Sequence, residues 1–158
     1  MIMGVFVSHT DFVIERDLPG SPAHAYRFWA EHDRKRIWTS CHPDWTVEED
    51  TFDFRIDGRE TLRWRTPEGV EHGFRAHYLD IVPGKQIIYA YAMNAGARQI
   101  SASLVTVEFV RKGEKTHMTY TEQAAFLDEA DAAPRSNGTG TGFDRLALAI
   151  ERSLAVSH

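Results

Sequence analysis

The order of the elements predicted from the sequence indicates a single α+β domain spanning residues 1–158. One strand and two short helices precede a long run of antiparallel strands, and an amphipathic helix closes the chain. Strands and helices do not alternate along the chain, which argues against a doubly wound nucleotide-binding fold. With 158 residues, of which 42% are hydrophobic, the chain is long enough to bury one core without disulfide or metal staples.

A strand and two helices are predicted for the first forty residues. Apolar and polar residues alternate over 10–18, as they do in a half-buried strand. Ser21 supplies an N-cap, and Pro22 is a favoured first residue for the helix that follows. A second short helix is expected over 33–38, and we interpret its charged run at 34–36 as a solvated face.

Residues 45–126 have the composition of an antiparallel meander. The expected strands cover residues 45–56, 59–66, 70–82, 86–93, 98–111 and 115–126. Turn-forming residues separate them at 57–58, 67–69, 83–84, 94–96 and 112–113. Together with the first strand, these make a sheet of seven strands, which is too large to stay flat. We therefore expect a curved sheet whose concave face is covered by apolar side chains.

The element that covers this face is predicted to be a helix at the end of the chain, where apolar residues recur at helical spacing. These are Phe143, Leu146, Ala147, Ile150 and Leu154. The preceding segment, 128–142, is rich in loop-forming residues, and we expect it to be a loop that could gate a cavity. Its glycines at 138, 140 and 142 lack the lysine of a phosphate-binding loop, so they predict a flexible lead-in to the helix.

Composition excludes several classes of protein. The chain has 18 Lys and Arg against 23 Asp and Glu, for a formal net charge of -5, which argues against a nucleic-acid binder. Cys41 is the only cysteine, so no internal disulfide or multi-cysteine zinc site is possible, and we expect neither a metal nor another cofactor. Residues 1–9 do not resemble a signal peptide and no apolar run is long enough to span a bilayer, so a cytoplasmic protein without membrane contact is expected.

Several short motifs, in their order along the chain, resemble a known superfamily. They are residues 12–16 before Ser21-Pro22, Trp29 and Trp38, residues 80–85 leading into 87–89, residues 105–109 and 118–123, and Arg135 through Gly138 to Gly142-Phe143 and Leu146. This pattern is similar to the helix-grip, START-like (SRPBCC) superfamily, and within it to the C-terminal domain of the activator of Hsp90 ATPase. The resemblance covers nearly the whole chain.

The resemblance implies a seven-stranded antiparallel sheet wrapped around a long C-terminal helix. It also implies a cavity between them, which in many relatives takes an apolar or amphipathic ligand. The chaperone-binding domain that precedes this domain in the eukaryotic activator is missing from this sequence, so a chaperone interaction is not expected. A homodimer is left open.

Two strands carry the candidate site residues. Tyr89, Tyr91 and Met93 share one face of their strand, either as plain core or as the wall of a cavity. Tyr120 and Glu122 share a face of the last strand, where a carboxylate among apolar neighbours would need a partner or would shift its pKa. The plainer alternative pairs Glu122 with an arginine at the open end of the strand; the candidates are Arg63, Arg65 and Arg75.

We expect the ligand-binding residues to be Trp38, Tyr89, Tyr91, Met93, Ser103, Tyr120, Glu122, Phe143, Leu146 and Ile150. Glu122 and His77 are the candidate polar or acid/base groups. The first hypothesis is binding of a small hydrophobic or amphipathic molecule. The alternatives are a cyclase-like or dehydratase-like enzyme that uses acid/base groups in the same cavity, and a protein-interaction module that resembles the co-chaperone. Whether the protein is an enzyme stays undecided from the sequence.

Overall fold

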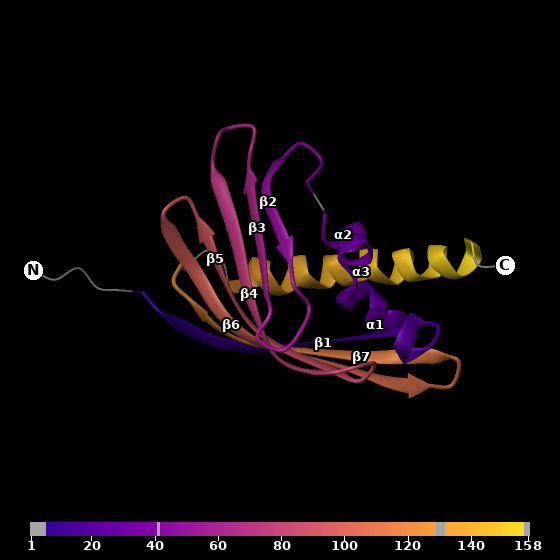
Figure 1. Ribbon diagram of the computed structural model, residues 1–158. Helices are drawn as coiled ribbons and strands as arrows, with labels where there is room; N and C mark the ends of the chain where they lie inside the picture. The colour runs from indigo at the N-terminus through magenta and orange to yellow at the C-terminus, as the bar shows by residue number, and fades with distance from the viewer. Residues whose placement is uncertain (1–5, 41, 129–131, 157–158) are drawn as a thin grey trace, which may run out of the picture.

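One antiparallel sheet of seven strands forms the body of the protein (Figure 1). The computed structural model describes residues 6–40, 42–128 and 132–156; Cys41 lies outside them. The strands are β1 (Ser8–Pro19), β2 (Thr46–Phe52), β3 (Arg59–Arg65), β4 (Glu71–Val82), β5 (Gln86–Ala95), β6 (Arg98–Lys112) and β7 (Lys115–Phe126). Their order in the sheet is β1-β7-β6-β5-β4-β3-β2. The predicted meander is therefore confirmed, and β1 joins it beside the last strand.

The predicted turns separate the strands, and irregularities in the pairing accompany the curvature of the sheet. Gly84 adopts a φ of 74°, which is the left-handed conformation that the turn after β4 requires. A register shift lies between Tyr78 and Asp80, and bulges of this kind bend a strand and increase its twist. β2 ends at Phe52, earlier than predicted, because the next residues turn and the N–H of Asp57 bonds the carbonyl of Tyr78 on β4.

Two short helices connect β1 to β2, as predicted. α1 (Pro22–Ala30) begins after Ser21, whose hydroxyl accepts from the backbone N–H of His24 at 3.2 Å. α2 (His32–Thr39) packs against α1, and the Trp38 indole donates to the carbonyl of Phe28 at 2.8 Å. The charged run at 34–36 is not a solvated face, because Lys35 is only 4% exposed. A carboxylate on β3 holds it inside, and the sequence pattern does not reveal that partner.

The C-terminal helix is longer than predicted. α3 (Ala132–Val156) includes most of the segment that we expected to be a loop; residues 129–131 lie outside the described part of the chain. Pro134 is tolerated because the first turn of a helix needs no N–H donors. The helix contacts β1 in this segment, where a Cβ at Gly140 would lie in ordinary contact, 3.4 Å, with the end of the Arg16 side chain. Tertiary contact thus outweighs the low helix propensity of glycine.

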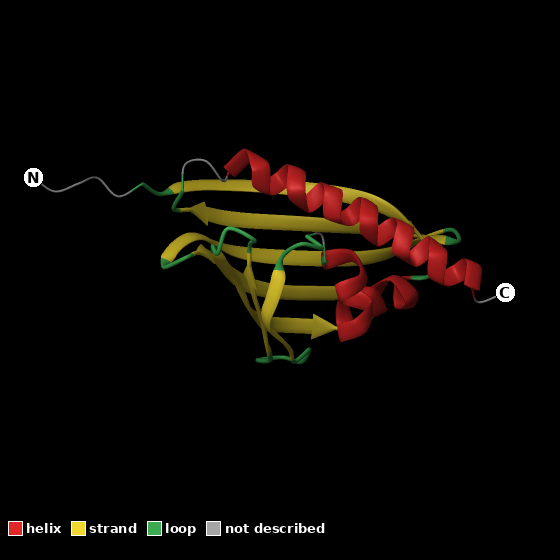
Figure 2. Ribbon diagram, turned by 90° about the horizontal axis from the view of Figure 1, so that it is seen from above, coloured by secondary structure: helices red, strands yellow, loops and turns green. Residues whose placement is uncertain are grey.

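All three helices lie over the same face of the sheet (Figure 2). α3 runs across that face with its predicted apolar stripe inward: Phe143, Leu146 and Ile150 are at most 1% exposed. α1 packs beside α3 against β6 and β7. The expected α+β class and the helix held against a curved sheet are therefore confirmed.

Candidate functional site

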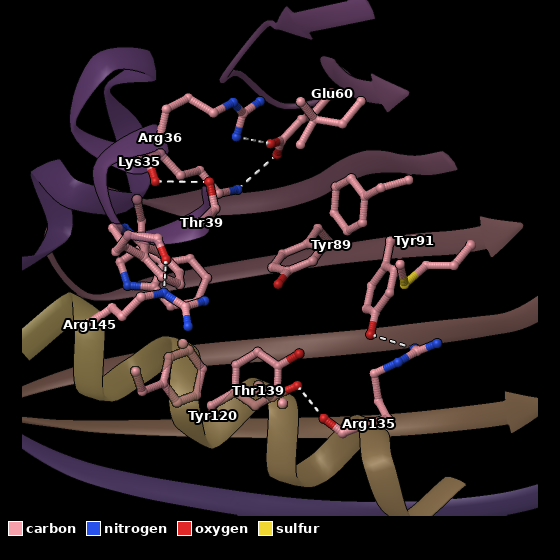
Figure 3. A pocket seen from close by; sticks show the side chains of 18 of the residues that line it. Lys35, Arg36, Thr39, Glu60, Tyr89, Tyr91, Tyr120, Arg135, Thr139 and Arg145 are labelled. Atoms are coloured by element: carbon pink, nitrogen blue, oxygen red, sulfur yellow. Dashed lines mark hydrogen bonds and ion pairs between the residues drawn. The ribbon is translucent and has the colours of Figure 1, made fainter. Parts of the chain in front are cut away.

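A cavity of about 380 Å³ lies between α2, α3 and the covered face of the sheet (Figure 3). Eight of the twenty described residues that line it are aromatic, namely Trp29, Trp38, Trp64, Phe74, Tyr89, Tyr91, Tyr120 and Phe143. Charged side chains also line it, namely Lys35, Arg36, Glu60, Arg135 and Arg145. Its size falls within the range of small-molecule pockets, which are mainly apolar with a few polar groups.

The aromatic wall is continuous because the rings contact one another. The centroids of Tyr120 and Phe143 are 5.0 Å apart, and those of Phe74 and Tyr91 are 5.1 Å apart. These separations are typical of edge-to-face and tilted aromatic pairs, which hold each ring in one orientation. The alternation of β5 predicts this arrangement, since Tyr89, Tyr91 and Met93 all point to the helix side.

Glu122 lies behind this wall and is fully buried. Its carboxylate accepts hydrogen bonds from the hydroxyls of Tyr91 and Ser103 at 2.7 Å each, and from Tyr120 at 2.5 Å. The guanidinium of Arg135 on α3 lies 3.7 Å from the same carboxylate. It also donates to the Tyr91 hydroxyl at 2.9 Å. Glu122 is thus a buried anion that organises one end of the cavity.

The phenols of the wall remain protonated. Burial raises the pKa of Tyr91, and the negative charge of Glu122 raises it further. Burial likewise raises the pKa values of Tyr89 and Tyr120 well above the ordinary value for a phenol. At neutral pH these side chains therefore act as neutral hydrogen-bond donors.

A second buried ionic cluster lies at the other side of the cavity (Figure 3). Lys35 Nζ donates to Glu60 at 2.8 Å and to the Tyr78 hydroxyl at 3.0 Å, and that hydroxyl donates to Glu60 at 2.6 Å. Arg36 forms an ion pair with the other Glu60 oxygen at 2.8 Å. Burial alone would raise the pKa of Glu60, but the charges of Lys35 and Arg36 hold it below its ordinary value. The cluster is therefore ionic.

The structure brings together only part of the predicted set. Trp38, Tyr89, Tyr91, Met93, Tyr120 and Phe143 line the cavity. Ser103 and Glu122 lie behind the wall and bond each other, while Leu146 and Ile150 belong to the closed core. His77 is on the opposite face of β4, where it bonds Asp57 at 3.2 Å. Arg63, Arg65 and Arg75 bond other residues, and Arg135 takes the position beside Glu122.

Sequence reasoning missed the charged part of the lining. Lys35 and Arg36 were assigned to solvent because their neighbours are charged, and Glu60 stands in a strand whose pairing the sequence does not give. Arg135 and Arg145 were missed for different reasons: the first lies in the expected loop, and the second was taken as part of the polar side of the helix. The only available signal was Glu60 alternating with Leu62 and Trp64, which placed it on a buried face.

The described residues hold no group of three or more His, Cys, Asp or Glu side chains that could bind a metal ion. Within the same ranges, none of the helices combines the length and apolar character needed to cross a membrane.

A curved antiparallel sheet closed by a long helix, with an aromatic cavity between them, defines the class of helix-grip proteins. The sequence matches the family described as Activator of Hsp90 ATPase homolog 1-like protein over residues 19–151, and the chain belongs to this family. Proteins with this fold commonly bind ligands in the cavity. The resemblance inferred from the motifs is therefore confirmed.

Solved structures agree with this assignment. An uncharacterized protein from Rhizobium leguminosarum is 42% identical, with a TM-score of 0.89 over 95% of this chain and 99% of that chain. A protein from Rhizobium loti is 38% identical, with a TM-score of 0.84 over 91% and 99%. A Chromobacterium violaceum protein, at 18% identity and a TM-score of 0.73 over 89% and 97%, shares the fold. No curated protein matches the chain.

Proposed function

We propose that this protein binds a small, largely apolar molecule in the cavity between α3 and the sheet. The observation that carries the proposal is a preformed space of about 380 Å³ whose wall is rich in aromatic and other apolar side chains and whose buried charges are held in ionic networks. Such a wall stabilises a ligand mainly by removing apolar surface from water, at about 25 cal/mol per Å². A few polar groups would then fix its orientation.

Trp29 gives a reason to expect a polar atom on that molecule. Its side chain lines the cavity, and its indole N–H is buried with no hydrogen-bond partner among the residues that the structure describes. An unpaired buried donor is unfavourable, and native proteins rarely retain one without a reason. A hydrogen-bond acceptor on the ligand would satisfy it.

The acid/base alternative has weaker support. Glu122 is not among the lining residues, and its two oxygens already accept three hydroxyl hydrogen bonds. His77, the other candidate, lies on the opposite face of the sheet. Binding without catalysis therefore fits the placement of these two groups better.

The neutral fluorophore N-phenyl-1-naphthylamine tests the proposal directly. Its fluorescence should rise on binding to the purified protein. Met93→Trp, which places a larger side chain in the cavity wall, should abolish the rise. The matched control is Val110→Trp, at a position that is 60% exposed and outside the cavity lining, and it should bind as the wild type does.

Native mass spectrometry of the protein from its own host should detect a retained small molecule in the wild type and in Val110→Trp, and not in Met93→Trp. Equal fluorescence in all three proteins would locate the probe outside the cavity. No fluorescence change with the wild type would argue that the cavity does not bind ligands of this size.

A further inference from the structure

The charges around the cavity do not balance. Among the lining side chains of the described residues, Lys35 and Arg36 face the carboxylates of Glu60 and Asp50, and Arg135 faces Glu122. Arg145 completes the set of cations and forms no ion pair within the described part of the chain. Among the described residues, the half-buried Arg145 guanidinium is therefore left without a counter-charge beside an aromatic wall.

The guanidinium of Arg145 makes one hydrogen bond to the described residues, through its Nε–H. Its Nε–H donates to the carbonyl of Trp38 at 2.9 Å, which fixes the side chain between α3 and α2. Gly142, one turn earlier on α3, lacks a Cβ, and a Cβ there would lie 3.5 Å from an Arg145 terminal nitrogen. The guanidinium therefore lies over Gly142, where the helix has no side chain. Neither of its terminal NH₂ groups forms a hydrogen bond to the described residues.

The position of Arg145 also separates it from the ionic network of Glu122. Figure 3 shows Arg145 and Arg135 at opposite ends of the cavity, both reaching from α3. Arg145 also lines the neighbouring groove between the helices, so it borders two hollows that are both open to solvent. An anionic group beside it can keep partial contact with water while an apolar body enters the aromatic wall.

From this arrangement we infer that the ligand is an amphipathic monoanion whose carboxylate pairs with Arg145. The planar guanidinium can bind a carboxylate through two parallel N–H···O bonds from its free terminal nitrogens. Pairing with this half-buried cation favours an anion over a neutral molecule of the same shape, because two charges attract more strongly near a protein surface than in bulk water. The inference rests on the proposed function and adds the chemical class of its ligand.

Competition between two isosteric probes tests it. Bound N-phenyl-1-naphthylamine is displaced with 2-naphthoate, which is an anion at neutral pH, or with neutral 2-naphthamide. For the wild type we expect naphthoate to displace the fluorophore at a concentration at least tenfold lower, as for a charge-assisted hydrogen bond. Arg145→Gln should bring this ratio close to one. Both competitors are compared on the same protein, so the ratio does not depend on how tightly the variant binds the fluorophore. Arg111→Gln, at an exposed position of β6 that lines neither the cavity nor this groove, should keep the wild-type ratio.

The outcomes separate the two claims. If the fluorophore does not bind the wild type, the proposed function fails and the inference fails with it. If it binds and the two competitors act equally or not at all, the anion preference is wrong and the proposed function stands. A preference that persists in Arg145→Gln overturns the assignment to Arg145. If that variant does not fold, Arg145→Lys is the second test. A lysine cannot make the two parallel hydrogen bonds to a carboxylate, so the ratio should fall at least threefold.

Discussion

The carboxylate of Glu122 on β7 and the guanidinium of Arg135 on α3 lie 3.7 Å apart in the interior of the protein. The contact joins the helix to the sheet at the end of α3 that precedes its apolar stripe. Because Arg135 also donates to Tyr91 and to Ser101 at 2.9 Å each, the ion pair connects β5, β6 and β7 through one side chain. The same residues back the aromatic wall, so stability and cavity shape depend on one network.

Removal of the buried carboxylate should be strongly destabilising. Glu122→Ala leaves three hydroxyls without their acceptor and removes the anion beside Arg135. Breaking such a buried pair lowers the free energy of unfolding by about 3–5 kcal/mol. Urea unfolding measures the change. Glu151→Ala, at an exposed position of α3, is the control and should change stability by less than about 0.5 kcal/mol. Similar values for both variants would contradict the network.

Replacing Lys35 alone should lower the free energy of unfolding more than replacing Lys35 and Glu60 together. Lys35→Met leaves Glu60 buried with only Arg36 and Tyr78, so a loss of about 3 kcal/mol is expected. Adding Glu60→Gln should recover part of that loss, because the unpaired charge is gone. A double-mutant cycle by urea unfolding yields the coupling energy, and a value near zero would show that the two charges do not depend on each other.

The grip of α3 on the sheet predicts a contrast between two leucines of the same helix. Leu146 is fully buried, and Leu146→Ala should cost about 2–5 kcal/mol through lost burial and the space left behind. Leu148 is 44% exposed, and Leu148→Ala should cost less than about 1 kcal/mol. Thermal unfolding of both variants measures the difference, and the reverse order would contradict the orientation of the helix.

Two glycines should respond in opposite directions to an added methyl group. Gly138 is helical and a Cβ there would meet no atom within 4 Å, so Gly138→Ala should stabilise the protein by about 0.5–1 kcal/mol. Gly58, in the turn before β3, is different because a Cβ there would lie 2.0 Å from the backbone carbonyl oxygen of Asp53. Gly58→Ala should therefore destabilise the protein. Differential scanning calorimetry distinguishes the two signs. A destabilised Gly138→Ala would indicate that residues 132–142 are not helical in solution.

A surface histidine should make stability depend on pH. His117 donates to Asp17 and Glu15 at 2.7 and 3.0 Å, and these bonds raise the pKa of His117 above its ordinary 6.5. The bond from His117, helped by Lys112, lowers the pKa of Asp17 to about 2.

The raised pKa of His117 and the lowered pKa of Asp17 determine how stability changes with pH. The stabilisation by His117 is complete below pH 6.5 and is lost as the pH rises through its raised pKa. The stabilisation by Asp17 is present above pH 3.8 and is lost as the pH falls toward 2. His117→Asn should therefore lower the Tm most between pH 3.8 and 6.5 and least in alkaline buffer. A Tm difference that does not change with pH would contradict this assignment.

Local patterns predicted most of the fold and half of the site. The alternation in β5 and β7 placed Tyr89, Tyr91 and Tyr120 on the covered face, and Ser21 marked the start of α1. The start of α3 was wrong because glycine and proline lower helix propensity, and contact with the sheet outweighs that preference. Lys35 was assigned to solvent because a run of charges gives no information about a partner 25 residues away.

The sequence alone determined the class of fold, the turns, the aromatic face of the sheet and the family, because each depends on the identity and spacing of residues that are close together in the chain. Only the tertiary structure decided which charges are buried and what each of them faces. Glu122 lies beside Arg135 rather than an arginine of a middle strand, and Arg145 has no counter-charge among the described residues, because strand pairing and helix position set those distances. Ionic interactions depend on the separation of charges in space, which spacing along the chain does not fix.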